Sequence, residues 1–246
     1  MPTDNQALTF RPADPDDLPQ VADLFLASRS GAAEAMPPVT APWDVVRSHI
    51  ESWDLSVREV WLAEDAMGLA GFATLTGPWL ESLYVAPQQQ GTGVGTALLE
   101  LVMALRPAGF GLWVFASNAP ARGFYRRHGL IELEHTDGSG NPERQPDIRM
   151  AWPGAEPLTY LRNQIDEVDA HLAELLARRF ALTAAVQGQK TALGGVAGHA
   201  GRDQARERAI VERMTQHVPG LETDRVAPIM DAVIAESLTA WEDAQG

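Results

Sequence analysis

Three glycines at alternate positions, Gly91, Gly93 and Gly95, lie between an apolar run and a segment whose apolar residues have helical spacing. A strand, a glycine-rich turn and a helix in this order place backbone N–H groups at the positive end of a helix dipole, where phosphate binds well. Because glycine has no Cβ, a ligand can approach the backbone closely at these positions. Such a turn also occurs without a ligand, so the glycines alone are a weak indication of a phosphate site.

The second group of chemically active residues consists of cations within an apolar helical pattern. Lys190 is the only lysine among 19 basic residues, which indicates a position that needs a compact ammonium group. Arg179 precedes it by about three helical turns, so the two cations share one helix face. Arg162 is rotated by about 100° from that face and would serve another pocket, such as that of a second subunit. Solvated charge on an amphipathic helix is the alternative for such residues.

The glycines and the cations require different kinds of elements to position them. Before residue 153, strand-like apolar segments alternate with helical patterns, which predicts a mixed α+β sheet flanked by helices. We expect strands at residues 8–12, 59–63, 69–76, 79–85, 110–116, 130–135 and 148–152. We expect one helix that begins at residues 14–17 and another that runs from the glycine turn to about residue 105. Two further helices should span residues 43–53 and 119–128.

A change of composition marks a second domain. Residues 153–157 contain two prolines and a glycine and are typical of a linker, and no later segment has a strand pattern. We expect helices at residues 158–186, 203–216 and 223–241, and loops at residues 194–201 and 217–221. We therefore predict one domain at residues 1–153 and an all-α, three-helix domain at residues 154–246. Its first helix is too long for two short helices to cover, which predicts a homodimer.

The composition excludes several classes of function. A net charge of -14 argues against nucleic acid or an anionic membrane as a partner. The absence of cysteine excludes disulfides, thiolate catalysis and cysteine-ligated metals, and we predict no metal site. There is no signal-peptide pattern and no apolar run of membrane-spanning length. We therefore expect a cytoplasmic protein that acts on small molecules.

Two motifs of the first domain occur together in one known family. The glycine turn reads QGTGVG at residues 90–95, and the segment at residues 118–130 reads NAPARGFYRRHGL. This pairing resembles the GNAT superfamily of N-acetyltransferases, and the resemblance covers roughly residues 8–152. It implies acetyl-CoA as the cofactor, with the pyrophosphate cradled by the backbone amides of Gln90, Gly91, Thr92, Gly93, Val94, Gly95 and Thr96.

The same resemblance implies roles for four further residues. Val85 would align the acetyl carbonyl through its backbone, Asn118 would hold the pantetheine arm, and Tyr125 would protonate the departing thiolate. A phenol with a pKa near 10 stays protonated at neutral pH and suits a thiolate leaving group. Glu81 precedes Leu83 by two strand positions, shares its face, and would serve as the general base, often through a water. An exposed strand-end carboxylate is the alternative for Glu81, and the acetyl acceptor is not identified.

The charged residues of the second half follow a recognisable order. In chain order they are Arg162, Asp166, Asp169, Arg179, Lys190, Arg202, Asp203, Arg206, Glu207 and Glu236, followed by Ser237. This order closely resembles the all-helical chorismate mutase family over most of residues 156–242. The resemblance implies an intertwined helical dimer in which each site takes one arginine from the partner chain, which agrees with the rotation of Arg162.

Chorismate is a dicarboxylate that rearranges to prephenate by a pericyclic step without a cofactor. An enzyme has to hold the folded conformer and stabilise charge on the ether oxygen. By resemblance, the partner's copy of Arg162 and the chain's own Arg179 bind the carboxylates, Lys190 binds the ether oxygen, and Glu207 binds the ring hydroxyl. The remaining residues that would complete the pocket are Asp203, Arg206, Ser237 and Trp241.

One departure from the family leaves alternatives open. The position of Trp241 often holds Gln or Glu directed toward the ether oxygen, whereas indole offers one donor and much bulk. The pocket could therefore act on 4-amino-4-deoxychorismate, or act as an isochorismate pyruvate lyase. A further alternative is that only the acetyltransferase is active and the helical domain serves in dimerisation or ligand sensing.

Overall fold

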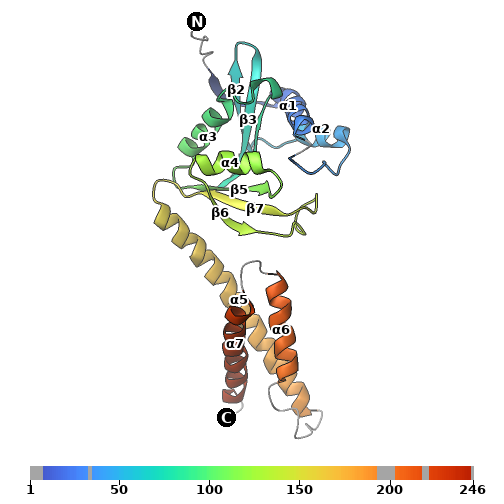
Figure 1. The fold of residues 1–246 in the computed structure, drawn as a ribbon, viewed down its shortest axis with the longest axis vertical. Helices are drawn as coiled ribbons and strands as arrows, with labels where there is room; N and C mark the ends of the chain where they lie inside the picture. Colours follow the sequence, from blue (N-terminus) through green and yellow to red (C-terminus); the bar gives the residue numbers. More distant parts are fainter. Residues whose placement is uncertain (1–7, 33–34, 193–202, 218–221, 245–246) are drawn as a thin grey trace. The chain divides into compact units, whose positions relative to one another are not determined.

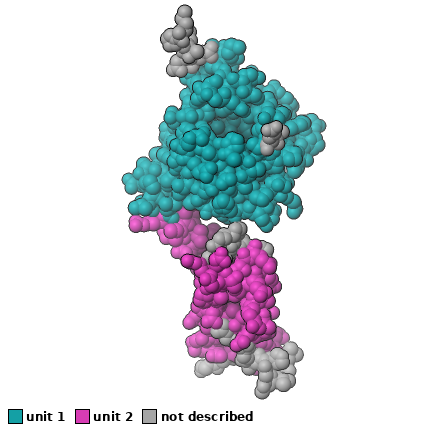
Figure 2. Space-filling model, viewed as in Figure 1, with its two compact units in different colours: residues 1–161 teal, residues 162–246 magenta. Residues whose placement is uncertain are grey.

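The computed structural model describes residues 8–32, 35–192, 203–217 and 222–244. It divides into two compact units, residues 1–161 and residues 162–246, which Figure 2 distinguishes by colour. The loop expected at residues 194–201, the residue Arg202 and most of the loop expected at residues 217–221 lie outside the described residues. The domain boundary at residues 153/154 stays a prediction.

Unit 1 is built on one seven-stranded mixed sheet with the order β1-β2-β3-β4-β5-β7-β6 (Figure 1). Its strands are β1 (Thr9–Pro12), β2 (Glu59–Asp65), β3 (Gly68–Thr76), β4 (Trp79–Val85), β5 (Phe110–Phe115), β6 (Ile131–His135) and β7 (Asp147–Trp152). The α-helices are α1 (Leu18–Gly31), α2 (Trp43–Glu51), α3 (Val94–Leu105) and α4 (Ala119–Arg127). Short 3₁₀ turns, η1 (Pro15–Asp17) and η2 (Pro87–Gln89), precede α1 and the glycine turn.

Helices cover both faces of the sheet because its central strands are apolar on both sides. On β3, Phe72 packs with residues of α1 and α2, whereas its neighbour Ala73 belongs to the cluster that includes α3. Leu98 and Val102 of α3 are completely buried in that second cluster. Two apolar layers around a sheet produce the α+β architecture that the sequence predicted. Each expected strand and helix of this unit is present, with bounds that differ by a few residues.

The sheet opens in its middle, between β4 and β5. These two strands are parallel and are paired only at Trp79 and Gly111, whereas the neighbouring pairs run antiparallel over several residues. Gly111 is suited to this junction because a Cβ there would lie 2.8 Å from the Trp79 ring. Beyond the junction the two strand ends are free to line a cavity.

After β7, the described residues form helices and no strands. These are α5 (Pro157–Ala192), α6 (Gln204–His217) and α7 (Thr223–Asp243). The first turn of α5 belongs to unit 1, where the Tyr160 ring lies against Gly109. In unit 2, α6 and α7 pack through Val211, Val226 and Met230. Within the described ranges, no helix combines the length and the apolarity needed to cross a bilayer.

The apolar stripe of α5 is not covered by the other helices of the chain. Seven of its large apolar residues have at least half of their surface exposed, namely Leu158, Ile165, Val168, Leu172, Leu175, Leu182 and Val186, whereas Leu161, Leu176 and Phe180 are half-buried. Exposed apolar area of this extent and regularity indicates an interaction surface. The predicted homodimer, the cytoplasmic location and the lack of a nucleic-acid partner stay predictions.

Candidate active sites

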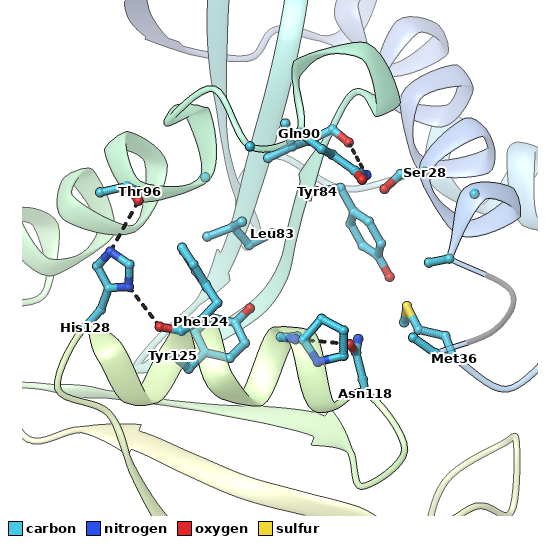
Figure 3. A pocket seen from close by; sticks show the side chains of 18 of the residues that line it. Ser28, Met36, Leu83, Tyr84, Gln90, Thr96, Asn118, Phe124, Tyr125 and His128 are labelled. Atoms are coloured by element: carbon cyan, nitrogen blue, oxygen red, sulfur yellow. Dashed lines mark hydrogen bonds between the residues drawn. The ribbon is translucent and has the colours of Figure 1, made fainter.

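Unit 1 contains a cavity of about 1020 Å³ that opens beside the separated ends of β4 and β5 (Figure 3). Its walls come from the end of α1 and the segment after it, from β4, from the glycine turn and α3, and from α4. Eight of the expected cofactor-site and catalytic residues line it, namely Val85, Gln90, Gly91, Gly93, Gly95, Thr96, Asn118 and Tyr125. The structure therefore brings the two sequence motifs to a single cavity.

The glycine turn ends where α3 begins, and its conformation requires glycine. Gly93 is the N-cap of α3 with φ of 103°, in the left-handed region that residues with a Cβ rarely adopt. The helix N-terminus beside the cavity presents backbone N–H groups, which suits an anion. Thr92 and Val94 do not line the cavity: the Thr92 hydroxyl donates to the Gln89 carbonyl over 2.7 Å, and the Val94 side chain is buried in the core. These two residues could contribute through their backbone.

Two phenols point into the cavity from opposite sides (Figure 3). Tyr125 is on α4, and burial raises the pKa of its phenol, with a smaller contribution from the nearby Tyr84. Burial also raises the pKa of Tyr84, on β4, against the opposing effect of Arg29. Both side chains therefore stay protonated well above neutral pH. A protonated phenol can donate a proton to a stronger base that forms within the cavity.

Glu81 lies in a smaller adjoining cavity of about 110 Å³ and does not line the main one. The two cavities share Leu83, Tyr84, Asn118 and Tyr125, among other residues. Glu81 is exposed, as the alternative interpretation of this carboxylate also expected. Because the two cavities share Leu83 and Tyr125, a water between them could carry a proton from one to the other.

Several lining residues were not expected from the sequence. Met36 follows α1, and its sulfur accepts a hydrogen bond from the guanidinium of Arg29, which is only 6% exposed. His128, at the end of α4, contacts Thr96 across the cavity wall. Its position three residues after Tyr125, within the same motif, is the signal that could have identified it.

Asn118 has a structural function at the start of α4. Its Oδ1 accepts a hydrogen bond from the Ala121 N–H over 3.1 Å, so the residue caps the helix. The same side chain lines both cavities. Capping fixes its rotamer, which would hold the amide nitrogen in a constant position for a ligand.

In unit 2 the structure joins two of the expected substrate-binding residues. Arg179, on α5, donates to the Ser237 hydroxyl over 2.5 Å and to the Val233 carbonyl over 3.2 Å, both on α7. Ser237 is 1% exposed, so Arg179 reaches a buried hydroxyl of α7 and links α5 to α7. The guanidinium is thereby held at the point where these two helices meet.

The other expected residues of unit 2 are distributed along its helices. Arg162, Lys190 and Arg206 are exposed. Asp203 caps α6 by accepting from the Arg206 N–H over 3.0 Å. Glu207 lines a groove of about 600 Å³ between α6 and α7, and Trp241 is half-buried near the end of α7. One chain therefore does not assemble all of these residues around a single described cavity.

Comparison with known families gives a match for each part of the chain. A model described as Acetyltransferase (GNAT) domain matches residues 56–130, and one described as Chorismate mutase type II matches residues 161–240. The peptidyl-lysine N-acetyltransferase YiaC of Escherichia coli (strain K12) is 28% identical over 152 residues, which are 61% of this chain and 99% of YiaC. The peptidyl-lysine N-acetyltransferase YjaB of Salmonella typhimurium is 35% identical over 85 residues, which are 34% of this chain and 57% of YjaB.

Solved structures share the fold of the sheet-containing unit. The apo form of YjaB from Escherichia coli has a TM-score of 0.51 at 20% identity and covers 61% of this chain and 99% of its own. A GCN5-related N-acetyltransferase from Rhodopseudomonas palustris has a TM-score of 0.50 at 24% identity, with coverage of 62% and 98%. The fold, the two motifs at one cavity and the family matches agree. The chain thus combines a GNAT acetyltransferase domain with a chorismate mutase type II domain.

Proposed function

We propose that the chain is a bifunctional enzyme that acetylates an amine with acetyl-CoA in its first domain and rearranges chorismate to prephenate in its second. The observation that carries the first activity is a single cavity lined by both the N-terminal turn of α3 and Tyr125. The first feature suits the pyrophosphate of the cofactor, and the second suits its thiol. The separation of β4 from β5 supplies the space for the pantetheine arm between them.

The reaction would proceed by direct transfer. The amine nitrogen attacks the thioester carbonyl, the C–S bond breaks, and the thiolate takes the proton of the Tyr125 phenol. Glu81 would accept the proton that the amine loses, through a water, from its adjoining cavity. Val85, which lines the main cavity, would align the acetyl carbonyl through its backbone, and Asn118 would hold the pantetheine.

The first activity can be tested with acetyl-CoA and a panel of acceptors that includes a lysine-containing peptide, a polyamine and free amino acids. The peptide belongs in the panel because both curated relatives are named for acting on peptidyl lysine. Thiol release and product mass would report transfer, and the intact mass of the enzyme would report self-acetylation, for which Lys190 is the only lysine. Thiol release no faster than without enzyme, for every acceptor, would contradict the proposal.

The second activity rests on the contact that fixes Arg179 between α5 and α7. A guanidinium held in place can bind a substrate carboxylate with two parallel hydrogen bonds. Lys190, on the same helix, would stabilise charge on the ether oxygen, and Glu207 would bind the ring hydroxyl. Asp203, Arg206, Ser237 and Trp241 would complete the pocket.

Mass analysis of products from chorismate, isochorismate and 4-amino-4-deoxychorismate separates the mutase from its alternatives. We expect prephenate from chorismate and loss of this product in Lys190→Ala. The exposed Arg178, which has no proposed role, provides a matched control, and Arg178→Ala should retain activity. If none of the three compounds is converted, the helical domain is a dimerisation or sensing module instead.

We also propose that the chain forms a homodimer through the exposed apolar stripe of α5. A second copy of α5 would present the same apolar residues, and a self-complementary surface suits a two-fold dimer. In such a dimer Arg162 would serve the site of the partner chain. The groove between α6 and α7, lined partly by Val211, Met230 and Ile234, would accept apolar side chains of the partner.

A further inference from the structure

His128 joins α3 to α4 at the wall of the cofactor cavity (Figure 3). Its Nδ1 lies 2.8 Å from the Phe124 carbonyl oxygen, and its Nε2 lies 3.2 Å from the Thr96 hydroxyl. The ring also packs against the Phe124 ring, with 4.5 Å between the centroids. Thr96 is in the first turn of α3, at the helix end that faces the proposed pyrophosphate site.

The chemistry of these partners fixes the direction of the hydrogen bonds. A carbonyl oxygen only accepts, so Nδ1 of His128 must carry a proton and donate to Phe124. In the neutral ring Nε2 is then an acceptor, and the Thr96 hydroxyl must donate to it. A hydroxyl that donates to histidine cannot donate that hydrogen to a phosphate oxygen at the same time.

Protonation of the ring reverses this second hydrogen bond. The imidazolium donates from Nε2 to the Thr96 oxygen, which frees the hydroxyl hydrogen to turn toward the cavity. A phosphate oxygen that accepts this hydrogen therefore favours the protonated ring, and the protonated ring favours the phosphate. Histidine is suited to such a change because it titrates nearest to neutral pH.

We propose that His128 positions the Thr96 hydroxyl as a donor to the cofactor pyrophosphate and takes up a proton from solvent when the cofactor binds. The proposal rests on acetyl-CoA as the cofactor. His128 is a positioning residue, since it acts on the phosphate through Thr96. The consequence is that affinity for the cofactor decreases as pH rises.

The surrounding charges are compatible with this exchange. The only ionisable residue of α3 is Glu100, one turn beyond Thr96. On α4, Tyr125 is protonated, Arg122 and Arg126 pair with Glu132, and Arg127 lines the cavity. His128 itself is the C-cap of α4.

Calorimetric titration of the full chain with dephospho-CoA tests the proton uptake. Dephospho-CoA is the appropriate probe because the 3′-phosphate of CoA titrates near pH 6 itself, as phosphate monoesters do, whereas the pyrophosphate does not. Binding heats in two non-phosphate buffers with different ionisation enthalpies give the number of protons taken up. We expect uptake near neutral pH, and an affinity that weakens by up to about tenfold per pH unit where uptake approaches one proton.

Matched variants separate this exchange from a merely structural contact. His128→Gln retains a side chain that can hydrogen-bond Thr96 but does not titrate, so binding should remain while uptake and the pH dependence disappear. Thr96→Val should abolish the uptake by removing the hydroxyl. His49→Gln, at an exposed histidine of α2, should leave the uptake unchanged.

Two results would overturn the proposal in different ways. Binding of dephospho-CoA without proton uptake, or uptake that persists in His128→Gln, would refute the role of His128 and leave the acetyltransferase intact. Failure of both CoA and dephospho-CoA to bind would refute the cofactor assignment, and the inference with it. Thermal unfolding of each variant would verify that the fold is retained.

Discussion

At the scale of single residues, Tyr125 is the group on which the acetyltransferase proposal depends most. Its phenol points into the cavity, and burial keeps its pKa above the ordinary value, so it is available as an acid at neutral pH. We predict that Tyr125→Phe lowers kcat by about 10²–10⁴-fold, because general acid catalysis is lost, while the KM for acetyl-CoA changes little. Steady-state kinetics with the best acceptor of the panel would measure this. An unchanged kcat would show that another group protonates the thiolate.

The two buried phenols also affect stability at high pH. Tyr84 and Tyr125 have raised pKa values in the folded state, so above about pH 10 the unfolded chain loses these protons first. The folded state then binds more protons than the unfolded state, and the free energy of unfolding must decrease as pH rises further. We predict that a Tyr84→Phe/Tyr125→Phe double variant loses stability less steeply than wild type above pH 10. Urea midpoints at several pH values would show this, and the two proteins should have equal slopes below about pH 9.

Local constraints explain which site residues the sequence could predict. Gly93 was identifiable because a glycine-rich turn between a strand and a helix is a local pattern, and the structure makes it a left-handed helix N-cap. Asn118 was expected only from the resemblance of its motif, and its capping of α4 was not expected. For Glu81, strand alternation predicted a face shared with Leu83, but the pairing of β3 with β4 shifts register at this residue. Its separation from the main cavity depends on where β4 and β5 diverge. The contact between Thr96 and His128 joins residues 32 positions apart, which no short-range pattern reveals.

At the scale of elements, the periodicity of apolar residues gave every helix and strand of unit 1 to within a few residues. The sheet order was not predictable in the same way, because β7 lies between β5 and β6 through pairings of residues distant in sequence. The packing of α3 against the sheet depends on Gly71 of β3. A Cβ at Gly71 would lie 2.8 Å from the Tyr84 carbonyl oxygen and 2.9 Å from Leu98.

We therefore predict that Gly71→Ala destabilises unit 1 by about 1–3 kcal/mol, the usual cost of overpacking a core. Denaturant unfolding followed by tryptophan fluorescence is a suitable measurement, since six of the seven tryptophans lie before residue 153. Gly140→Ala is the matched control, because a Cβ at Gly140 meets nothing within 4 Å and φ there is ordinary. Equal stability of the two variants would mean that α3 shifts at no cost.

At the scale of the whole molecule, the uncovered stripe of α5 predicts that the chain is a dimer. We expect sedimentation at about twice the chain mass of 26.6 kDa. Leu172→Asp combined with Leu175→Asp should yield monomers, because each places a charge on the apolar stripe. Met67→Asp, at an 83% exposed residue of unit 1, should leave the mass unchanged. A monomeric wild-type chain would contradict the proposed dimer.

Dimerisation also predicts how defective chains should combine at the mutase sites. If each site uses Lys190 from one chain and Arg162 from its partner, Arg162→Ala and Lys190→Ala are both inactive alone. In a heterodimer of the two variants, one site combines the intact Lys190 of the first chain with the intact Arg162 of the second, whereas the other site lacks both cations. After the variants are mixed, unfolded and refolded together, about half of the dimers are mixed and about a quarter of all sites are intact.

Prephenate formation in this mixture should therefore reach about a quarter of the wild-type rate. A mixture of Lys190→Ala with Arg179→Ala provides the matched control, because both residues would belong to the same chain at each site. The control mixture can recover activity only if Lys190 and Arg179 of one site come from different chains. We therefore expect no recovery in it. Recovery with Arg162→Ala and none with Arg179→Ala would assign each cation to its chain, and the opposite pattern would refute the shared site.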